Sequence, residues 1–170
     1  CHISGHLNDH YDPRNKILRL SDATYNSPSV AAIGVAAHEC GHAVQHAVGY
    51  APLKIRGALV PVANFGSTLA WPLILIGLLI RSDAAVLLIN LGILLFSAAV
   101  LFQIVTLPVE FNASKRAVQA LEKGGMLYGE EIDGTKAVLR AAALTYVASA
   151  ASMILQLLRL IIIGGRRQDD

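Results

Sequence analysis

The sequence predicts a mainly α membrane protein with about three transmembrane helices. Its 170 residues are 54% hydrophobic and its mean hydropathy is +0.52, which is too apolar for a soluble domain of this length. The apolar residues gather in three runs instead of spreading along the chain. A more polar stretch before the first run carries histidines at helical spacing, so the fold combines membrane helices with a polar functional region.

The three apolar runs cover residues 58–80, 84–107 and 141–163. Each is close to the roughly 20 residues that a helix needs to cross a hydrocarbon core of about 30 Å. A large soluble helical core is the alternative, but the second run contains no charged residue, which argues against it. Residues 81–83 leave room only for a tight turn, so the first two runs predict an antiparallel transmembrane hairpin.

The first and third runs contain residues that interrupt a simple apolar helix. Pro61 and Pro72 in the first run remove backbone donors, and neighbouring helices can satisfy the carbonyls that they free. Gln156 and Arg159 lie in the third run, where Arg159 is close enough to its end to reach the membrane interface. We therefore predict a transmembrane helix for each run.

Residues 1–50 precede the first run and include a short strand-like segment. Residues 16–20 read KILRL, and the preceding Asp12-Pro13 with Asn15 is typical of a turn. The region therefore predicts a short β hairpin or an edge strand. Such a strand could pair with an extended peptide or could merely cover a helix, and the sequence leaves both interpretations open.

The motif HECGH at residues 38–42 lies in an apolar stretch for which Ser27 predicts a helix cap. His38 and His42 are one turn apart, about 6 Å at Cβ, so both imidazoles can reach one metal ion. Glu39 lies at the neighbouring edge, where it can act as a base on a water molecule. An HExxH pattern also arises by chance, but here its apolar flanks would bury polar groups that need partners or a metal. The motif therefore predicts a zinc hydrolase site.

A catalytic zinc usually has three protein ligands, and His46 and Glu110 are the two candidates for the third. A helix rises about 12 Å from His38 to His46, so these two cannot share an ion unless the helix breaks. Pro108 predicts the start of a helix over residues 108–125, with Glu110 in its first turn. Two spans separate this helix from the motif, and an even number of crossings returns the chain to the same side. Glu110 is therefore the predicted ligand, although a helix N-terminus also favours a carboxylate without any metal.

Four stretches together resemble the membrane zinc metallopeptidases of the YugP type found in bacteria: GHLNDHYDP, HECGHAVQH, GYAPLKIRGALVPVANFGSTLAWPL and LPVEFNASKRA. The resemblance covers nearly the whole chain and implies a membrane-embedded, zincin-like peptidase of the gluzincin type. It places the zinc ligands at His38, His42 and Glu110 and the catalytic glutamate at Glu39. Many gluzincins have an acidic residue four positions after the ligand glutamate, whereas this chain has Ser114, which leaves the partner of one histidine ligand open. Members generally carry a further N-terminal hydrophobic segment, so we expect one upstream.

We expect a single membrane-embedded metallopeptidase domain over residues 1–170. Its parts are the strand region with the motif helix, the transmembrane hairpin, the third-ligand helix and a last transmembrane helix, at residues 1–50, 58–107, 108–125 and 141–163. The cations on the motif side of the hairpin are Lys54, Arg56, Lys115, Arg116 and Lys123, against only Arg81 at its other end. The positive-inside rule then predicts a multi-pass cell-membrane protein whose metal site faces the cytoplasm, although Arg166 and Arg167 argue against this orientation.

The sequence thus predicts a zinc-dependent, membrane-bound endopeptidase. Zn²⁺ would activate a water molecule for attack on the peptide bond, with Glu39 as the general base. The residue that stabilises the oxyanion stays open among His46, Asn112, Tyr128 and Tyr146. A catalytically inactive or structural-zinc membrane adaptor is the alternative. The expected partners are the lipid bilayer and a peptide or membrane-protein substrate, and the net charge of +2 gives no reason to expect nucleic acid.

Overall fold

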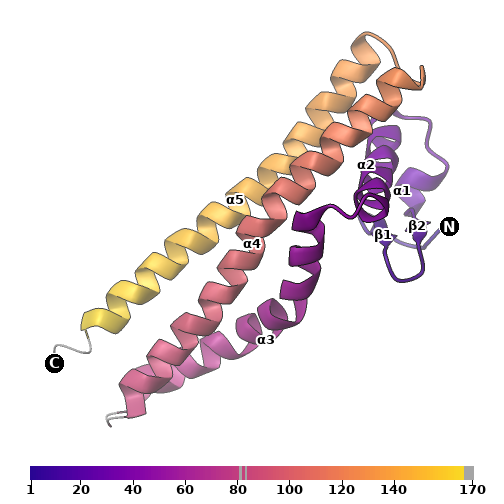
Figure 1. Cartoon of the computed structure of the whole chain (residues 1–170). Helices are drawn as coiled ribbons and strands as arrows, with labels where there is room; N and C mark the ends of the chain where they lie inside the picture. The colour runs from indigo at the N-terminus through magenta and orange to yellow at the C-terminus, as the bar shows by residue number, and fades with distance from the viewer. Residues whose placement is uncertain (81, 83, 167–170) are drawn as a thin grey trace. The chain divides into compact units, whose positions relative to one another are not determined.

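The structure is a computed structural model that describes residues 1–80, 82 and 84–166. In chain order its elements are β1 (His10–Asp12), β2 (Ile17–Arg19), α1 (Asp22–Tyr25), α2 (Val30–Ala47), α3 (Ala51–Leu79), α4 (Ala84–Lys123) and α5 (Glu130–Arg166) (Figure 1). Residues Arg81 and Asp83 of the predicted tight turn, and the cation Arg167, lie outside the described residues.

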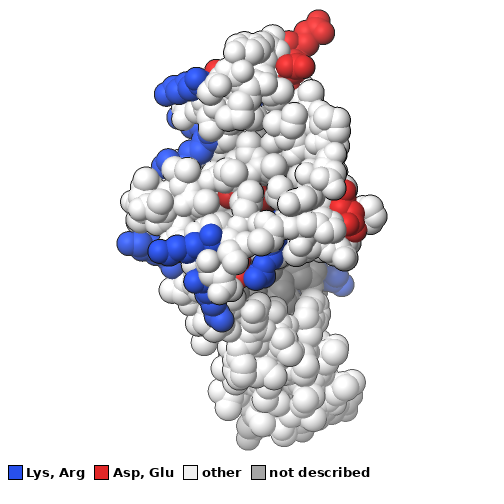
Figure 2. All heavy atoms as spheres, turned by 90° about the vertical axis from the view of Figure 1, so that its right-hand side faces the viewer, with Lys and Arg blue, Asp and Glu red and all other residues white. Residues whose placement is uncertain are grey.

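The predicted fold class is confirmed, because α3, α4 and α5 are each long and apolar enough to cross a membrane. Large apolar side chains are exposed along these helices, including Leu79, Leu87 and Leu155, as expected where lipid replaces water as the solvent. Lys, Arg, Asp and Glu gather over part of the visible surface in Figure 2 and leave a long stretch without charge. The remaining regular structure of the described residues comprises α1, α2 and a small two-stranded sheet, which confirms the predicted hairpin.

The chain divides into two compact units. Unit 1 comprises Cys1–Leu53 and Leu107–Thr145, and unit 2 comprises Lys54–Thr106 and Tyr146–Asp170. The helices α4 and α5 contribute to both units, whereas α2 and the hairpin belong to unit 1 alone. The HECGH motif and Glu110 therefore lie in the same unit, and the single-domain organisation stays a prediction.

Unit 2 is held together by close contacts between its helices. Its buried apolar cluster consists of Ala70, Ile74, Phe96, Val100 and Leu160. Glycine allows the helices to approach, because a Cβ on Gly66 would lie 2.6 Å from the carbonyl oxygen of Leu95. Lipid tails are as apolar as these side chains, so tight packing of small residues provides much of the association between membrane helices.

The helix α3 contains Pro61 and Pro72, and its ribbon bends along its length in Figure 1. Each proline lacks a backbone N–H and clashes with the carbonyl one turn earlier, which is the common cause of a kink. The helix begins at Ala51, before the predicted apolar run, because Lys54 and Arg56 are polar but favour a helix. The apolar run therefore marks the part of α3 suited to the membrane and not its whole length.

The prediction that Pro108 begins a separate helix is wrong. The helix α4 continues from Ala84 to Lys123 with Pro108 inside it. Pro108 removes a single helical hydrogen bond, the one to the carbonyl of Ile104, and packing around the fully buried Val109 and Ala113 stabilises the helix at this point. Glu110 is therefore in a helix interior, so a helix N-terminus does not explain its position.

Two other helices begin at different residues from those predicted. Ser29, not Ser27, caps α2, because the Ser29 hydroxyl accepts a hydrogen bond from the backbone N–H of Ala32 at 3.2 Å. The helix α5 begins at Glu130, well before the apolar run at residues 141–163. Its first turn is acidic, which stabilises a helix N-terminus but is invisible to a search for apolar residues.

The hairpin of unit 1 packs beside α2. Strands β1 and β2 are antiparallel, with Tyr11 opposite Leu18. The turn between them is closed by the carboxylate of Asp12, which accepts hydrogen bonds from the backbone N–H groups of Arg14 and Asn15. The side-chain hydrogen bond from Asn15 is the main cause that lowers the pKa of Asp12. The turn chemistry predicted from the sequence is therefore present.

Candidate metal centre

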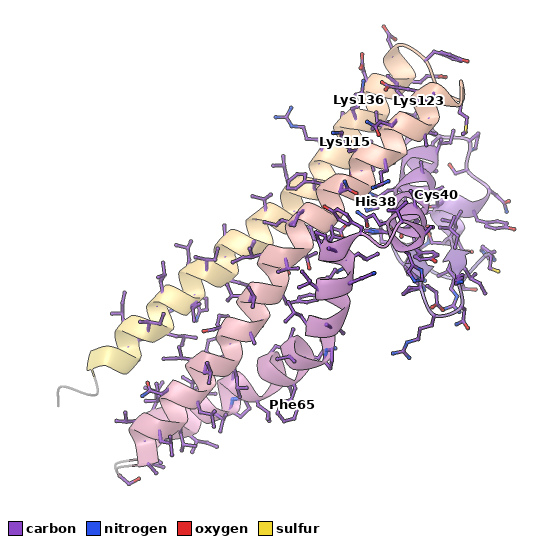
Figure 3. The ribbon with its side chains drawn as sticks, in the orientation of Figure 1. His38, Cys40, Phe65, Lys115, Lys123 and Lys136 are labelled. Carbon is purple, nitrogen blue, oxygen red and sulfur yellow. The ribbon has the colours of Figure 1, made fainter. Side chains whose placement is uncertain are left out.

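The candidate metal centre lies in unit 1, between α2 and α4. His38 lies on the side of α2 that faces α4, and His42 follows one turn later (Figure 3). The Nε2 atoms of His38 and His42 are 3.1 Å and 3.6 Å from Oε2 of Glu110. One nitrogen of each histidine and one oxygen of Glu110 lie within 4.8 Å of one another. The structure thus brings together the three residues that the sequence predicts as ligands.

Gly41 allows α2 to approach α4 at this point. A Cβ on Gly41 would lie 2.5 Å from the carbonyl oxygen of Ala113, closer than van der Waals contact permits. Ala113 is itself fully buried and stands between Glu110 and Ser114 on α4. The glycine of the HECGH motif is therefore a packing residue that brings the two ligand-bearing helices together.

Each histidine has a second partner at its other ring nitrogen. Nδ1 of His38 lies 3.0 Å from the hydroxyl of Ser114, and Nδ1 of His42 lies 3.0 Å from Oε1 of Gln45. Such outer partners fix the orientation of a ligand imidazole and leave Nε2 for the metal. Ser114 therefore occupies the place at which the sequence left the partner of a histidine open.

The hydrogen bonds of Gln45 determine which nitrogen of His42 carries the proton. Nε2 of Gln45 donates to the carbonyl of Val109 at 2.8 Å and to Oδ1 of Asn112 at 3.1 Å. Its Oε1 is therefore the atom that faces His42 and can only accept, so Nδ1–H of His42 is the donor. Neutral His42 then has its lone pair on Nε2, on the side of Glu110.

This arrangement fits a metal ion. The Nε2 lone pair of His42 and the carboxylate of Glu110 face each other at 3.6 Å, and a cation bound by both acceptors would stabilise this arrangement. Glu110 is only 3% exposed, and positive charge nearby stabilises a buried carboxylate. Two imidazoles and a carboxylate are a common ligand set of catalytic zinc. The chemistry of the donor set thus agrees with a metal bound by His38, His42 and Glu110.

The electrostatics of His42 also favour positive charge at this position. Burial by itself lowers the pKa of His42, but the nearby carboxylate of Glu110 more than reverses this effect and raises the pKa of His42 above its ordinary value. A second proton on the ring and a metal ion are two ways to supply that charge. Either the proton or the metal ion would compensate the negative charge of the buried Glu110 carboxylate.

Glu39 lies beside the two histidines and is held by the hairpin. Its Oε2 accepts a hydrogen bond from the backbone N–H of Tyr11 at 2.9 Å. Burial raises the pKa of Glu39 above its ordinary value, while the nearby His42 and His38 act in the opposite direction. The pKa of this carboxylate is therefore shifted towards the neutral range, as suits a group that accepts and returns a proton.

His46 is outside the group of candidate ligands. The helix α2 is unbroken from Val30 to Ala47, so the rise of the helix separates His46 from His38 as the sequence predicts. Its Nδ1 instead lies 2.8 Å from the phenol oxygen of Tyr11. His46 therefore contacts the same strand residue that bonds Glu39.

The other candidates for the oxyanion partner differ in their surroundings. Oδ1 of Asn112 accepts hydrogen bonds from Nε2 of Gln45 and from Nε of Arg116. This oxygen therefore helps to orient Gln45, which bonds His42. Tyr128 is 67% exposed in the segment between α4 and α5. Tyr146 belongs to unit 2. The oxyanion partner therefore stays open.

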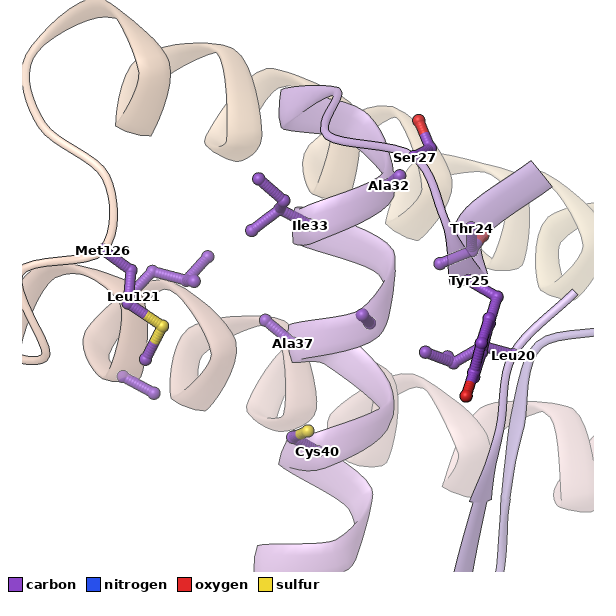
Figure 4. Close-up of a pocket in the computed structure, with 12 residues that line it drawn as sticks. Leu20, Thr24, Tyr25, Ser27, Ala32, Ile33, Ala37, Cys40, Leu121 and Met126 are labelled. Atoms are coloured by element: carbon purple, nitrogen blue, oxygen red, sulfur yellow. The ribbon is translucent and has the colours of Figure 1, made fainter. Parts of the chain in front are cut away.

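Cys40 lines an apolar pocket that is separate from the metal centre (Figure 4). The pocket has a volume of about 360 Å³ and is lined mainly by Leu20, Tyr25, Ile33, Ala37, Leu121 and Met126. Burial, and then the charge of Glu39, raise the pKa of the Cys40 thiol, which disfavours the reactive thiolate. Cys40 is therefore a lining residue of this pocket and takes no part in the donor set.

Sequence reasoning missed two residues of the site. Gln45 lies three positions after His42 on the same helix face, a spacing from which an outer partner of a ligand could have been inferred. Tyr11 contacts Glu39 across 28 residues of sequence, through its backbone N–H. No side-chain pattern in the sequence indicates a contact that is made by a backbone N–H.

Comparison with known proteins places these residues in a family. The protein "Putative membrane protease YugP" of Bacillus subtilis (strain 168) is 50% identical over 168 residues, which cover 99% of this chain and 73% of the relative. No solved structure matches the chain. A family model described as "Putative neutral zinc metallopeptidase" matches residues 1–165. The chain therefore belongs to this family of neutral zinc metallopeptidases.

Proposed function

We propose that this protein is a zinc-dependent, membrane-bound endopeptidase of the gluzincin type. The observation that carries the proposal is the convergence of His38, His42 and Glu110 around one point, with the proton of His42 fixed on the nitrogen that faces away from it. The family supports zinc peptidase chemistry, and the name of the bacterial relative supports action at a membrane.

His38, His42 and Glu110 would hold the ion. Zinc, when bound, supplies a Lewis acid that polarises the scissile carbonyl and makes water a nucleophile near neutral pH. Among the described residues the donor group has three members, as in catalytic sites, whereas structural zinc sites have four protein ligands. The donor count therefore favours a catalytic centre over the structural-zinc adaptor.

Glu39 would be the general base. It is adjacent to His38 on α2, and its carboxylate is oriented by the backbone N–H of Tyr11. In this role it takes the proton of the attacking water and returns it to the amine of the departing peptide. The raised pKa of Glu39 supports the role, because a carboxylate with a pKa closer to neutrality accepts a proton more readily.

A peptide in extended conformation would be the substrate class. The N–H of Tyr11 is directed to Glu39, and in an antiparallel strand the N–H and C=O of one residue lie on the same edge. The carbonyl of Tyr11 would therefore be available beside Glu39 to accept a hydrogen bond from a substrate backbone. The protein would be a multi-pass membrane protein whose metal site faces the cytoplasm, for which the lysines and arginines of residues 54–56 and 115–123 are the support.

Peptide cleavage by the zinc-loaded protein in detergent tests this function. We expect cleavage of members of a mixed peptide library, detected by mass spectrometry, to stop when a chelator removes the metal and to return when Zn²⁺ is added. The physical reason is that the buried donor set binds the ion on which the carbonyl polarisation depends. Cleavage that survives complete removal of the metal would contradict the proposal.

A further inference from the structure

We propose that Tyr11 and His46 form a latch that holds strand β1 against α2 and so positions Glu39. Both are positioning residues, since they act through Glu39. The catalytic consequence rests on the proposed function, whereas the latch itself is a property of the fold.

Tyr11 contacts α2 at two points on one face of the helix. Its backbone N–H donates to Oε2 of Glu39 at 2.9 Å, and its phenol oxygen lies 2.8 Å from Nδ1 of His46. Positions seven residues apart lie on nearly the same side of a helix, about 10 Å from each other along its axis. One strand residue thus spans two turns of the motif helix.

The hairpin needs this support because it is small. The strands β1 and β2 have three residues each, and an isolated two-stranded hairpin is marginal in water. Leu20, the residue that follows β2, forms a parallel bridge with His2. The two hydrogen bonds of Tyr11 join β1 to α2.

The latch matters for Glu39 because a glutamate side chain is flexible. The backbone N–H of Tyr11 holds Glu39 in a fixed position only while β1 stays packed against α2. The phenol of Tyr11, through its bond to His46, is the second contact that keeps β1 there. The ring of His46 packs against the ring of Tyr11 with centroids 5.8 Å apart, and both side chains are half-buried. Loss of the phenol bond would let β1 move and would release the carboxylate of Glu39.

Two substitutions remove the latch from either side. Tyr11→Phe deletes the phenol oxygen but keeps the backbone N–H and the ring, and His46→Ala deletes the imidazole that bonds the phenol. Tyr25→Phe is the matched control, because Tyr25 is 48% exposed and its ring contacts His2 in another part of unit 1. His46→Gln tests rescue, since its amide can again bond the phenol.

Amide hydrogen exchange at position 11, measured by mass spectrometry on the zinc-loaded protein, decides the latch. We expect exchange about tenfold faster in Tyr11→Phe and in His46→Ala, as for the loss of one hydrogen bond, with no change in Tyr25→Phe and partial recovery in His46→Gln. Zinc content should stay at the wild-type level in all four. Unchanged exchange in Tyr11→Phe and His46→Ala would overturn the latch.

Peptide hydrolysis decides the link to Glu39. We expect kcat to fall about tenfold in each latch variant, and the double variant Tyr11→Phe/His46→Ala to be no slower than either, because both remove the same bond. Faster exchange with unchanged kcat would overturn the positioning role. If the wild-type protein cleaves no peptide, the proposed function fails, and the exchange measurement still decides the latch.

Discussion

Replacing Glu39 with glutamine is expected to lower kcat about 10²- to 10⁴-fold, the usual contribution of a general base, while zinc binding is retained. Glutamine keeps the size of the side chain and can still accept the hydrogen bond from the N–H of Tyr11, but it cannot take a proton from water. The measurement is the initial rate of peptide cleavage at saturating substrate, with zinc content determined on the same sample.

Zinc content separates loss of the base from loss of the site in the Glu39→Gln variant. The donor group consists of His38, His42 and Glu110 and does not include Glu39. Wild-type kcat in Glu39→Gln with a full complement of zinc would show that another group is the base.

Gly41→Ala is expected to disrupt the centre without touching any ligand. The new Cβ would meet the backbone of Ala113, with 2.5 Å to its oxygen, and backbone cannot rotate away as a side chain can. We expect the free energy of unfolding in detergent to fall by about 1–3 kcal/mol, the usual effect of overpacking. The histidines should also move away from Glu110, which should weaken zinc binding about 10- to 100-fold, as for the loss of an outer partner.

Gly57→Ala is the matched control for Gly41→Ala. Gly57 is also in a helix, and a Cβ there would meet no atom within 4 Å. Its stability should be unchanged or higher, because alanine favours a helix over glycine by roughly 1 kcal/mol. Equal zinc affinity in Gly41→Ala and Gly57→Ala would show that contact between α2 and α4 does not depend on Gly41.

The three long apolar helices could be predicted from the sequence because their signal is local. A run of some twenty apolar residues has few other interpretations, and the described part of the chain contains three helices long and apolar enough to cross a membrane. The ends of these helices could not be predicted in the same way. Polar residues extend α3 and α5 beyond the apolar runs. Pro108 lies inside α4, where packing around the buried Val109 and Ala113 outweighs the local effect of the proline.

The three donor residues could be predicted from the sequence, whereas most of the residues that bond them could not. His38 and His42 follow from helical spacing, and Glu110 follows from counting membrane crossings, which is a statement about topology and not about local propensity. Gln45 and Ser114 act through hydrogen bonds whose partners depend on how α2 packs on α4. Tyr11 acts on Glu39 through its backbone, which every residue has, so its identity gives no sign of the contact.

The zinc content of the detergent-purified protein is the most direct test of the central claim that His38, His42 and Glu110 hold one ion. Three samples are compared by mass spectrometry of the metal: wild type, Glu110→Ala and His46→Ala. We expect about one zinc per chain in wild type and in His46→Ala, and none in Glu110→Ala, because three ligands define the site and His46 is not among them. Zinc kept by Glu110→Ala and lost by His46→Ala, or a wild type that binds no zinc on reconstitution, would contradict the account.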